Sequence, residues 1–270
     1  MPSAFLEDRG VVRVAGADAR AFLQGLVTCD MDRVSPDKAA YGALLTPQGK
    51  VICDFLVSET SEAFHLDCPE ILAADLAKRL RLYRLRSKID VDDLSPARMV
   101  AADWNGSGEG LADPRHPRLG TRRIVDRLDG PGGAANNAAA YEAHRIALAI
   151  PKGGIDFVYG DAFPHEINLD LMHGVDFKKG CYVGQEVVSR VEHRGAARKR
   201  IAHATFEETP PPVGAALLAG EIEIGTMGSG VAGQGLAMVR VDRVEDATVA
   251  GLPILADGKP LTLALPAKRR

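Results

Sequence analysis

The spacing of apolar residues in the first hundred positions predicts a series of strands and two helices. Short apolar or alternating runs are typical of strands, and apolar residues about three to four positions apart are typical of helices. The predicted strands are residues 9–15, 41–45, 51–58, 63–68, 88–91 and 97–104, and the predicted helices are 17–28 and 69–83. This β-α-β-β-α-β-like order indicates a ferredoxin-like α+β unit rather than a doubly wound parallel sheet.

The pattern changes in the second half of the chain. Residues 105–117 and 129–137 are rich in Gly, Pro, Asp and Asn and are predicted to be loops, and a helix is predicted over 137–149. Short apolar segments separated by glycines follow, with predicted strands at 198–206, 222–224, 236–241 and 261–265. Such segments are typical of a small β-barrel. We therefore expect two domains, an α+β region of two interleaved subdomains over 1–195 and a barrel over 196–270.

Reactive and charged side chains concentrate between residues 177 and 200. Cys181 follows two lysines and a glycine, and the valines beyond it predict a helix whose first turn holds Gln185 and Glu186. Lysines and a helix N-terminus close to a thiol favour its thiolate form. The opposite interpretation is that Cys181 is a small buried hydrophobe, which is the usual place of a free cysteine. The residues alone leave both interpretations open.

Composition and charge exclude several classes of protein. The chain has 270 residues, 46% of them hydrophobic, and a net charge of −3, and this near-neutral balance argues against a general nucleic-acid binder. No apolar run approaches the roughly 20 residues that span a membrane. The N-terminus lacks the charged-then-apolar pattern of a signal peptide, so we expect a cytoplasmic protein.

The spacing of cysteines and histidines predicts no metal site. The four cysteines lie far apart without a C-x-x-C pair, which fits neither a disulfide framework nor a zinc site. Cys29, Cys53 and Cys68 fall within predicted helices or strands and are expected in the core. No two of the seven histidines have the i, i+4 spacing of metal ligands on one helix. We therefore expect no stably bound metal.

The motif KGCYVGQE, residues 179–186, is similar to the signature of the YgfZ family of folate-binding proteins. Members of that family are relatives of the glycine-cleavage aminomethyltransferase and assist iron–sulfur cluster assembly or repair. The resemblance extends through FLQGLVTCD, LTPQGKVICDFLV, LRLYRLRSKIDV and FPHEINLDL. It implies an aminomethyltransferase-like fold with a central folate opening and a terminal barrel. It also implies tetrahydrofolate or a one-carbon derivative as cofactor, and iron–sulfur assembly proteins or client enzymes as partners.

The resemblance assigns roles to the residues of the motif. Cys181 and Lys179 are expected on or near the surface as the functional pair, which would either react or dock. The other signature residues are Gly180, Tyr182, Gly184, Gln185, Glu186 and Arg190.

Three further residues are expected to contact folate. Asp54 interrupts the apolar run VICDFLV, where a carboxylate is either exposed at a strand edge or buried for a purpose. The aminomethyltransferase relatives carry an aspartate at the matching place, facing the reacting nitrogens of the folate. Glu166 and Asn168 in FPHEINLDL either belong to an amphipathic loop-to-helix segment or supply the few polar groups that an apolar ligand pocket needs.

The sequence also contains one dense cluster of basic residues. The cluster consists of Arg190, His193, Arg194, Arg198, Lys199 and Arg200. It is either a solvated face or a docking site for a folate glutamate tail or an acidic partner.

Two rival functions remain open. The first is a folate-dependent aminomethyl- or methyltransferase. In those enzymes, by the resemblance, the strand that matches RIALAI carries a pterin-reading glutamate, and the absence of an acid from RIALAI argues against this function. The second rival is an RNA-modification factor that uses the basic cluster.

Overall fold

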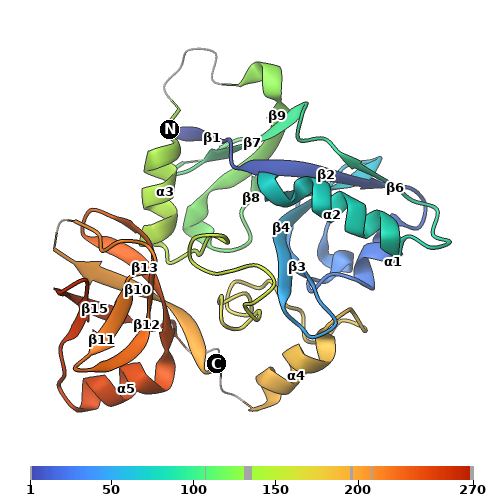
Figure 1. Cartoon of the computed structure of the whole chain (residues 1–270). Coiled ribbons are helices and arrows are strands. Elements are labelled where there is room, and N and C mark those ends of the chain that lie inside the picture. The colour runs from blue at the N-terminus through green and yellow to red at the C-terminus, as the bar shows by residue number, and fades with distance from the viewer. Residues whose placement is uncertain (1, 107, 131–135, 195–196, 208, 268–270) are drawn as a thin grey trace. The chain divides into compact units, whose positions relative to one another are not determined.

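The computed structural model describes residues 2–106, 108–130, 136–194, 197–207 and 209–267. They form two compact units. The first unit consists of Met1–Tyr141 and Met172–Gln185, and the second of Glu142–Leu171 and Glu186–Arg270. The chain therefore enters the second unit, returns to the first, and ends in the second (Figure 1). Among the described residues, no helix has both the length and the apolar character needed to cross a membrane.

A five-stranded sheet in the order β3-β4-β5-β2-β6 organises the first unit, and every neighbouring pair is antiparallel. Its strands are β2 (Arg9–Ala15), β3 (Ala40–Leu45), β4 (Val51–Glu59), β5 (Ala63–Pro69) and β6 (Asp90–Asp93). The helices are α1 (Ala19–Gln24) and α2 (Glu70–Tyr83). All seven elements overlap their predicted segments. The predicted helix 17–28 is too long, because Gly25 caps α1.

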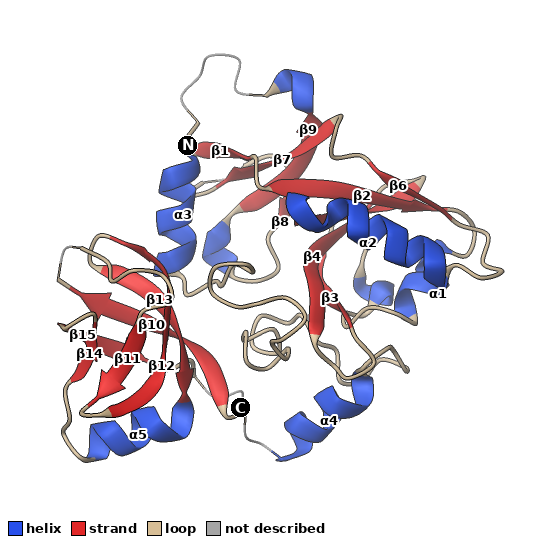
Figure 2. Ribbon diagram, in the orientation of Figure 1, coloured by secondary structure: helices blue, strands red, loops and turns tan. Residues whose placement is uncertain are grey.

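Alternation along the strands decides which side chains meet the helices. Val12 of β2 and Phe55 of β4 belong to one buried apolar cluster with Leu23 of α1 and Leu76 of α2, and both helices cover this face of the sheet (Figure 2). Asp54, next to Phe55, points to the opposite face. Asp54 of β4 and Asp67 of β5 lie on that opposite face.

The first unit also contains a four-stranded antiparallel sheet in the order β1-β7-β9-β8. Its strands are β1 (Ser3–Leu6), β7 (Arg98–Asp103), β8 (Leu111–Ala112) and β9 (Thr121–Asp126), and short 3-10 helices lie at Met31–Arg33, Pro117–Leu119 and Arg127–Asp129. Only β7 was predicted. β9 is half-buried along most of its length, so no alternation of apolar and polar residues marks it as a strand. The predicted loop 129–137 lies largely outside the described residues.

The second unit contains a closed six-stranded barrel in the order β10-β13-β12-β11-β14-β15. Its strands are β10 (Lys199–Phe206), β11 (Ala216–Ala219), β12 (Ile222–Val231), β13 (Gln234–Arg240), β14 (Ile254–Ala256) and β15 (Lys259–Ala264). This confirms the predicted α+β fold with a C-terminal barrel. Helix α5 (Val241–Val249), which lies beside the barrel strands (Figure 1), was not predicted. Its Val244 and Ala247 join the barrel core.

Two more helices lie where the chain passes between the units: α3 (Ala138–Ala147) and α4 (Gln185–Arg194). Both were predicted. Between α3 and Leu171 the chain of the second unit runs in turns that Asp156 ties to the barrel. The carboxylate of Asp156 accepts hydrogen bonds from the N–H and the hydroxyl of Ser229, at 2.6 and 2.7 Å, and from the Arg145 guanidinium at 3.0 Å.

Candidate functional site

The KGCYVGQE motif forms a loop whose centre is exposed and whose flanks are buried. The Cys181 thiol is exposed, whereas Lys179 and Tyr182 retain only 9% and 7% of their accessible surface. A Cβ built on Gly180 would have no atom within 4 Å, so the space beside the thiol is open. The first unit therefore presents one exposed thiol on a loop fixed on both sides of it.

Lys179 is not a surface residue, which corrects the expectation drawn from the resemblance. Its ammonium group donates hydrogen bonds to the carbonyl oxygens of Val27 and Cys29, both at 2.7 Å, and lies 5.3 Å from the centre of the Tyr182 ring. Burial lowers the pKa of Lys179. A buried ammonium is stable only where partners replace its water, as two carbonyls and an aromatic face do here. Lys179 therefore positions the loop from its interior.

Asp176 shapes the chain just before the motif. One oxygen of its carboxylate accepts hydrogen bonds from the N–H groups of Lys178 and Lys179, at 2.7 and 3.0 Å. The other oxygen lies 3.1 Å from the Arg33 guanidinium. The N–H of Asp176 donates to the Thr28 carbonyl at 2.9 Å. An aspartate that binds the backbone two and three residues ahead is a common way to build a tight turn.

The chain after Cys181 is fixed by a reciprocal cap at the start of α4. The Gln185 side chain accepts from the N–H of Tyr182 at 3.3 Å, and the N–H of Gln185 donates to the Tyr182 carbonyl at 3.2 Å. Gly184 has φ 82°, and a Cβ there would lie 2.6 Å from the Thr46 carbonyl oxygen. Only glycine fits this conformation and this contact. Tyr182, Gly184 and Gln185 are thus loop-building residues.

The remaining two signature residues lie on the exposed side of α4. Glu186 occupies the first turn, as predicted, and pairs with Arg190 at 2.7 Å. Their side chains are 86% and 55% exposed, and an exposed pair at this spacing stabilises a helix only slightly.

Cys181 differs from the three other cysteines in its surroundings. All four cysteines lie in described parts of the chain, and Cys29, Cys53 and Cys68 are buried, as predicted. Burial raises the pKa of Cys29 to about 12, and burial together with the neighbouring Cys68 raises that of Cys53. Buried thiols of this kind are unreactive.

Asp54 is buried on β4, with 4% of its surface accessible, so the alternative of an exposed strand edge is wrong. Its carboxylate accepts a hydrogen bond from the Tyr41 hydroxyl at 2.8 Å. Burial, followed by the charge of Asp54, raises the pKa of Tyr41 well above its ordinary value. Tyr41 therefore remains a neutral hydrogen-bond donor toward Asp54.

Beside Asp54 lies a chain of buried ion pairs, which we call the buried ion network: Arg9, Asp67, Arg122, Asp113 and Arg115. Asp67 of β5 binds Arg9 and Arg122, both at 2.6 Å. Asp113 binds Arg122 at 3.1 Å and accepts two hydrogen bonds from Arg115, at 2.9 and 2.6 Å. The network therefore joins the five-stranded sheet to β9.

The network reaches the Asp54 pair through an aromatic contact. The Arg115 guanidinium lies 5.6 Å from the centre of the Tyr41 ring. Asp113 and Arg115 were predicted to lie in a loop, yet both are buried. Although burial opposes it, the charges of Arg115 and Arg122 lower the pKa of Asp113 to about 2.

Glu166 and Asn168 lie in the second unit, in a run of turns rather than at the start of a helix. The Glu166 carboxylate accepts from the N–H of Phe163 at 2.9 Å. Asn168 is buried with φ 59°, and its amide donates to the Ile201 carbonyl at 2.8 Å. Within the described chain, the Asn168 side-chain oxygen has no hydrogen-bond partner. This oxygen is enclosed by the segment itself.

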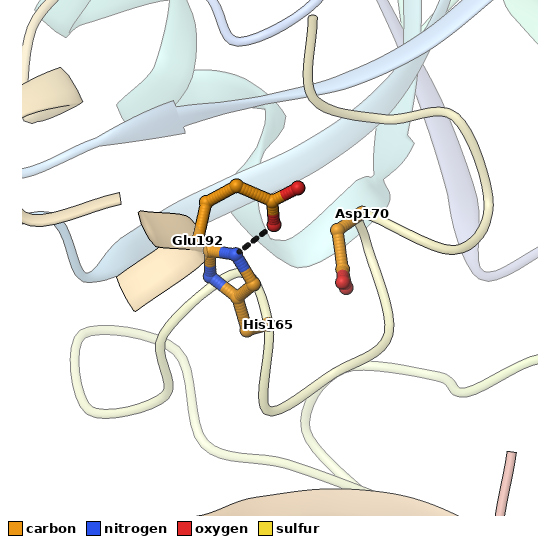
Figure 3. A group of neighbouring side chains, drawn as sticks. All are labelled: His165, Asp170 and Glu192. Carbon is orange, nitrogen blue, oxygen red and sulfur yellow. Dashed lines mark hydrogen bonds and ion pairs between the residues drawn. The ribbon is translucent and has the colours of Figure 1, made fainter. Parts of the chain in front are cut away.

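The second unit also contains a polar group made of His165, Asp170 and Glu192 (Figure 3). The sequence spacing of these residues did not predict it. One ligand atom from each lies within 4.8 Å of the others, and His165 Nε2 is 3.2 Å from Glu192. Both oxygens of Asp170 accept from Arg200, at 2.6 and 2.9 Å. A guanidinium already holds this carboxylate in a bidentate pair, so the group is an ion-pair cluster and a poor cation site.

The predicted basic cluster is only partly available to a ligand. Arg200 is engaged with Asp170, and Arg190 pairs with Glu186. The remaining members are exposed: His193, Arg194, Arg198 and Lys199.

Two family models match the chain. Residues 7–102 match the GCVT N-terminal domain, and residues 198–269 match the CAF17 C-terminal β-barrel domain. The structure is similar to that of glycine cleavage system aminomethyltransferase T from Bartonella henselae, with a TM-score of 0.73 and 15% sequence identity. The similarity covers 98% of this chain and 84% of that one. The fold is therefore that of the aminomethyltransferase class.

Sequence relatives narrow the class to a family. The chain is 32% identical to human "Iron-sulfur cluster assembly factor IBA57, mitochondrial", over 89% of this chain and 78% of the relative. It is 34% identical to the IBA57 homolog of Mycosarcoma maydis and 33% identical to that of Neurospora crassa. These matches cover 76% and 73% of this chain, but it spans only 57% and 52% of the two fungal proteins. The chain belongs to the IBA57 family of iron–sulfur cluster assembly factors, which is YgfZ-type.

The arrangement of Lys179 predicts a loss of stability when its ammonium is removed. Lys179→Met should lower the free energy of unfolding by about 1–3 kcal/mol, because two buried carbonyls lose their donor. Lys178→Met, at the exposed neighbouring position, is the matched control and should change it by about 0.5 kcal/mol or less. Urea unfolding of both variants measures the difference. Equal midpoints and slopes for the two variants would contradict the role given to Lys179.

The buried ion network predicts a particular response to acid. The folded-state pKa of Asp113, about 2, lies below the ordinary carboxyl value, so its contribution is complete above about pH 4. That contribution is lost as the pH falls from about 4 through about 2. Asp113→Asn should therefore be less stable than the wild type at neutral pH and lose less stability over this acid range. Asp75→Asn, on the exposed side of α2, is the control. If Asp113→Asn loses as much free energy of unfolding between about pH 4 and about pH 2 as this control does, the assignment is refuted.

Proposed function

We propose that this chain is an accessory protein of iron–sulfur cluster assembly or repair that acts through Cys181. The observation that carries the proposal is the exposed thiol between the buried anchors Lys179 and Tyr182. Membership of the IBA57 family supports it. Thiolates are the usual protein ligands of iron–sulfur clusters, which commonly take four of them. One exposed cysteine supplies one, so a partner or client enzyme must supply the others.

The geometry favours an accessory role over turnover. A transferase directs its polar groups at charge that develops on the substrate. In the motif that this chain shares with the YgfZ family, the buried residues hold a loop in place. Its one reactive group is exposed, where another protein can reach it. The fold is common to both classes and does not separate them.

We further propose tetrahydrofolate, or a one-carbon derivative, as the ligand. The match of residues 7–102 to the GCVT N-terminal domain supports this, because that region contains the buried carboxylate of Asp54. A buried carboxylate is a suitable partner for the N–H groups of a pterin ring. Glu166 and Asn168, which lie in the second unit, are proposed as folate contacts on the resemblance alone.

The accessory role predicts a separation of function at Cys181. Cys181→Ser should keep the wild-type unfolding curve and folate affinity, because the side chain is exposed and lies outside the proposed folate contacts. In cells that lack the native protein, it should fail to restore the activity of iron–sulfur enzymes, which the wild type restores. Iodoacetamide should label Cys181 before Cys29, Cys53 and Cys68, as checked by mass spectrometry.

Lys178→Ala, beside the same loop, is the matched control and should restore activity. Restoration by Cys181→Ser would overturn the accessory role of the thiol. Glycine-cleavage aminomethyl transfer by the wild type, lost in Asp54→Asn and kept in Cys181→Ser, would instead establish the transferase.

The folate proposal has its own variant. Asp54→Asn keeps the size of the side chain and removes its charge, and it should weaken tetrahydrofolate binding by about 1–3 kcal/mol. Titration calorimetry of the purified protein measures the change, and Asp90→Asn, exposed on β6, is the control. Failure of the wild type to bind tetrahydrofolate at millimolar concentration would remove the ligand from the proposal and leave the role of Cys181 intact.

A further inference from the structure

The first unit contains a cavity of about 590 Å³ to which no role has been given. Residues from both sheets line it, with β2, β4 and β5 on one side and β7, β8 and β9 on the other. A volume of this size is typical of small-molecule sites. The cavity lies within one unit, so its walls are fixed by the strand pairing of that unit.

Part of the lining is apolar. Leu56, Val100 and Ile124 contribute side chains from three strands, and Leu94 and Leu111 extend the surface. A ligand that fills the cavity would gain from burying a hydrocarbon or aromatic body against these residues.

The charged part of the lining is predominantly basic. Arg13, Arg98, Arg122 and Arg123 line the cavity together with His65, against two acids, Glu59 and Asp67. Glu59 binds Arg20 at 2.6 Å, and Asp67 is shared between Arg9, outside the lining, and Arg122. Arg123 pairs with Asp103 at 3.4 Å. The lining itself carries four guanidiniums against two carboxylates, so its own charge is positive.

Two of these guanidiniums can turn to a ligand at little cost. Arg13 makes one contact with Asp92 at 3.0 Å, and Arg98 makes one with Asp126 at 3.3 Å. Both aspartates are about half exposed, and ion pairs of this kind contribute little to stability. Arg122 differs, because the buried ion network holds it in place.

His65 lies where the positive potentials of Arg13 and Arg98 overlap. Burial, followed by the charges of Arg13 and Arg98, lowers the pKa of His65. His65 of β5 is the cross-strand neighbour of Arg13 of β2, while Arg98 comes from the other sheet. The potential that disfavours a proton on His65 favours an anion at the same place.

We propose that this cavity binds a small organic anion, with its acidic group between Arg13 and Arg98 and its apolar body against Leu56, Val100 and Ile124. The site is separate from the proposed folate contact on β4, because neither Asp54 nor Tyr41 lines the cavity. The buried ion network lies between them, with Asp67 and Arg122 in the cavity wall and Arg115 over the Tyr41 ring.

The experiment uses two probes that share one aromatic body. 8-Anilinonaphthalene-1-sulfonate carries an anionic group, and N-phenyl-1-naphthylamine is the same molecule without it. Fluorescence titration of the native wild-type protein should give one sulfonate site, and the neutral probe should bind at least about tenfold more weakly, the effect of about one charge-assisted hydrogen bond. Equal affinity for the two probes would overturn the proposal without any variant.

Variants locate the site. Arg13→Gln and Arg98→Gln should each weaken the sulfonate probe by about tenfold and leave the neutral probe unchanged. Arg79→Gln, which removes an arginine on α2 that is as exposed as Arg98, should bind both probes as the wild type does. Unchanged sulfonate affinity in Arg13→Gln and Arg98→Gln, both shown to be folded by near-ultraviolet circular dichroism, would also overturn the proposal. Asp54→Asn should bind the probe normally, so this proposal and the folate proposal fail independently.

Discussion

The buried ion network is the constraint on which the first unit depends. Three arginines and two aspartates that are largely removed from water are stable only if each charge meets an opposite charge in good geometry. Asp67 and Asp113 each meet two guanidiniums, and the remaining positive charge lies over the Tyr41 ring, whose hydroxyl binds Asp54. The network thereby links the five-stranded sheet to β9 of the four-stranded sheet. It also separates the interior into a side that holds Asp54 and a side that holds the basic cavity.

Lys179 applies the same principle on a smaller scale. The hydrogen-bond partners of its ammonium are neutral carbonyls, so no carboxylate pairs directly with this buried positive charge. Burial therefore lowers the pKa of Lys179. A hydrophobic residue of similar length would fill the space but leave two carbonyls without a donor. The ammonium therefore specifies where the chain before Cys181 lies, and the capped start of α4 specifies where it lies afterwards.

Sequence reasoning succeeded where a structural element carries its own pattern. The strands of the five-stranded sheet, α2 and the barrel strands β10, β12, β13 and β15 show apolar alternation or helical spacing, and Cys53 and Cys68 fall within such patterns. The short barrel strands β11 and β14 were not predicted. It failed where partners are distant in sequence. The burial of Lys179 depends on carbonyls about 150 residues earlier, and Asp113 and Arg115 are held in a segment whose composition is that of a loop. The ion-pair cluster of His165, Asp170 and Glu192 joins residues with no common spacing.

The geometry of the signature motif also bears on what such a signature encodes. Of its eight residues, five act on the backbone or fill the interior: Lys179, Tyr182, Val183, Gly184 and Gln185. Gly180 leaves space and Glu186 faces solvent. A rigid loop reduces the conformational entropy that the Cys181 thiol would lose on meeting a partner, and so raises affinity without further contacts. Five positions therefore build the loop, and the proposed function uses one atom of it, the Cys181 sulfur.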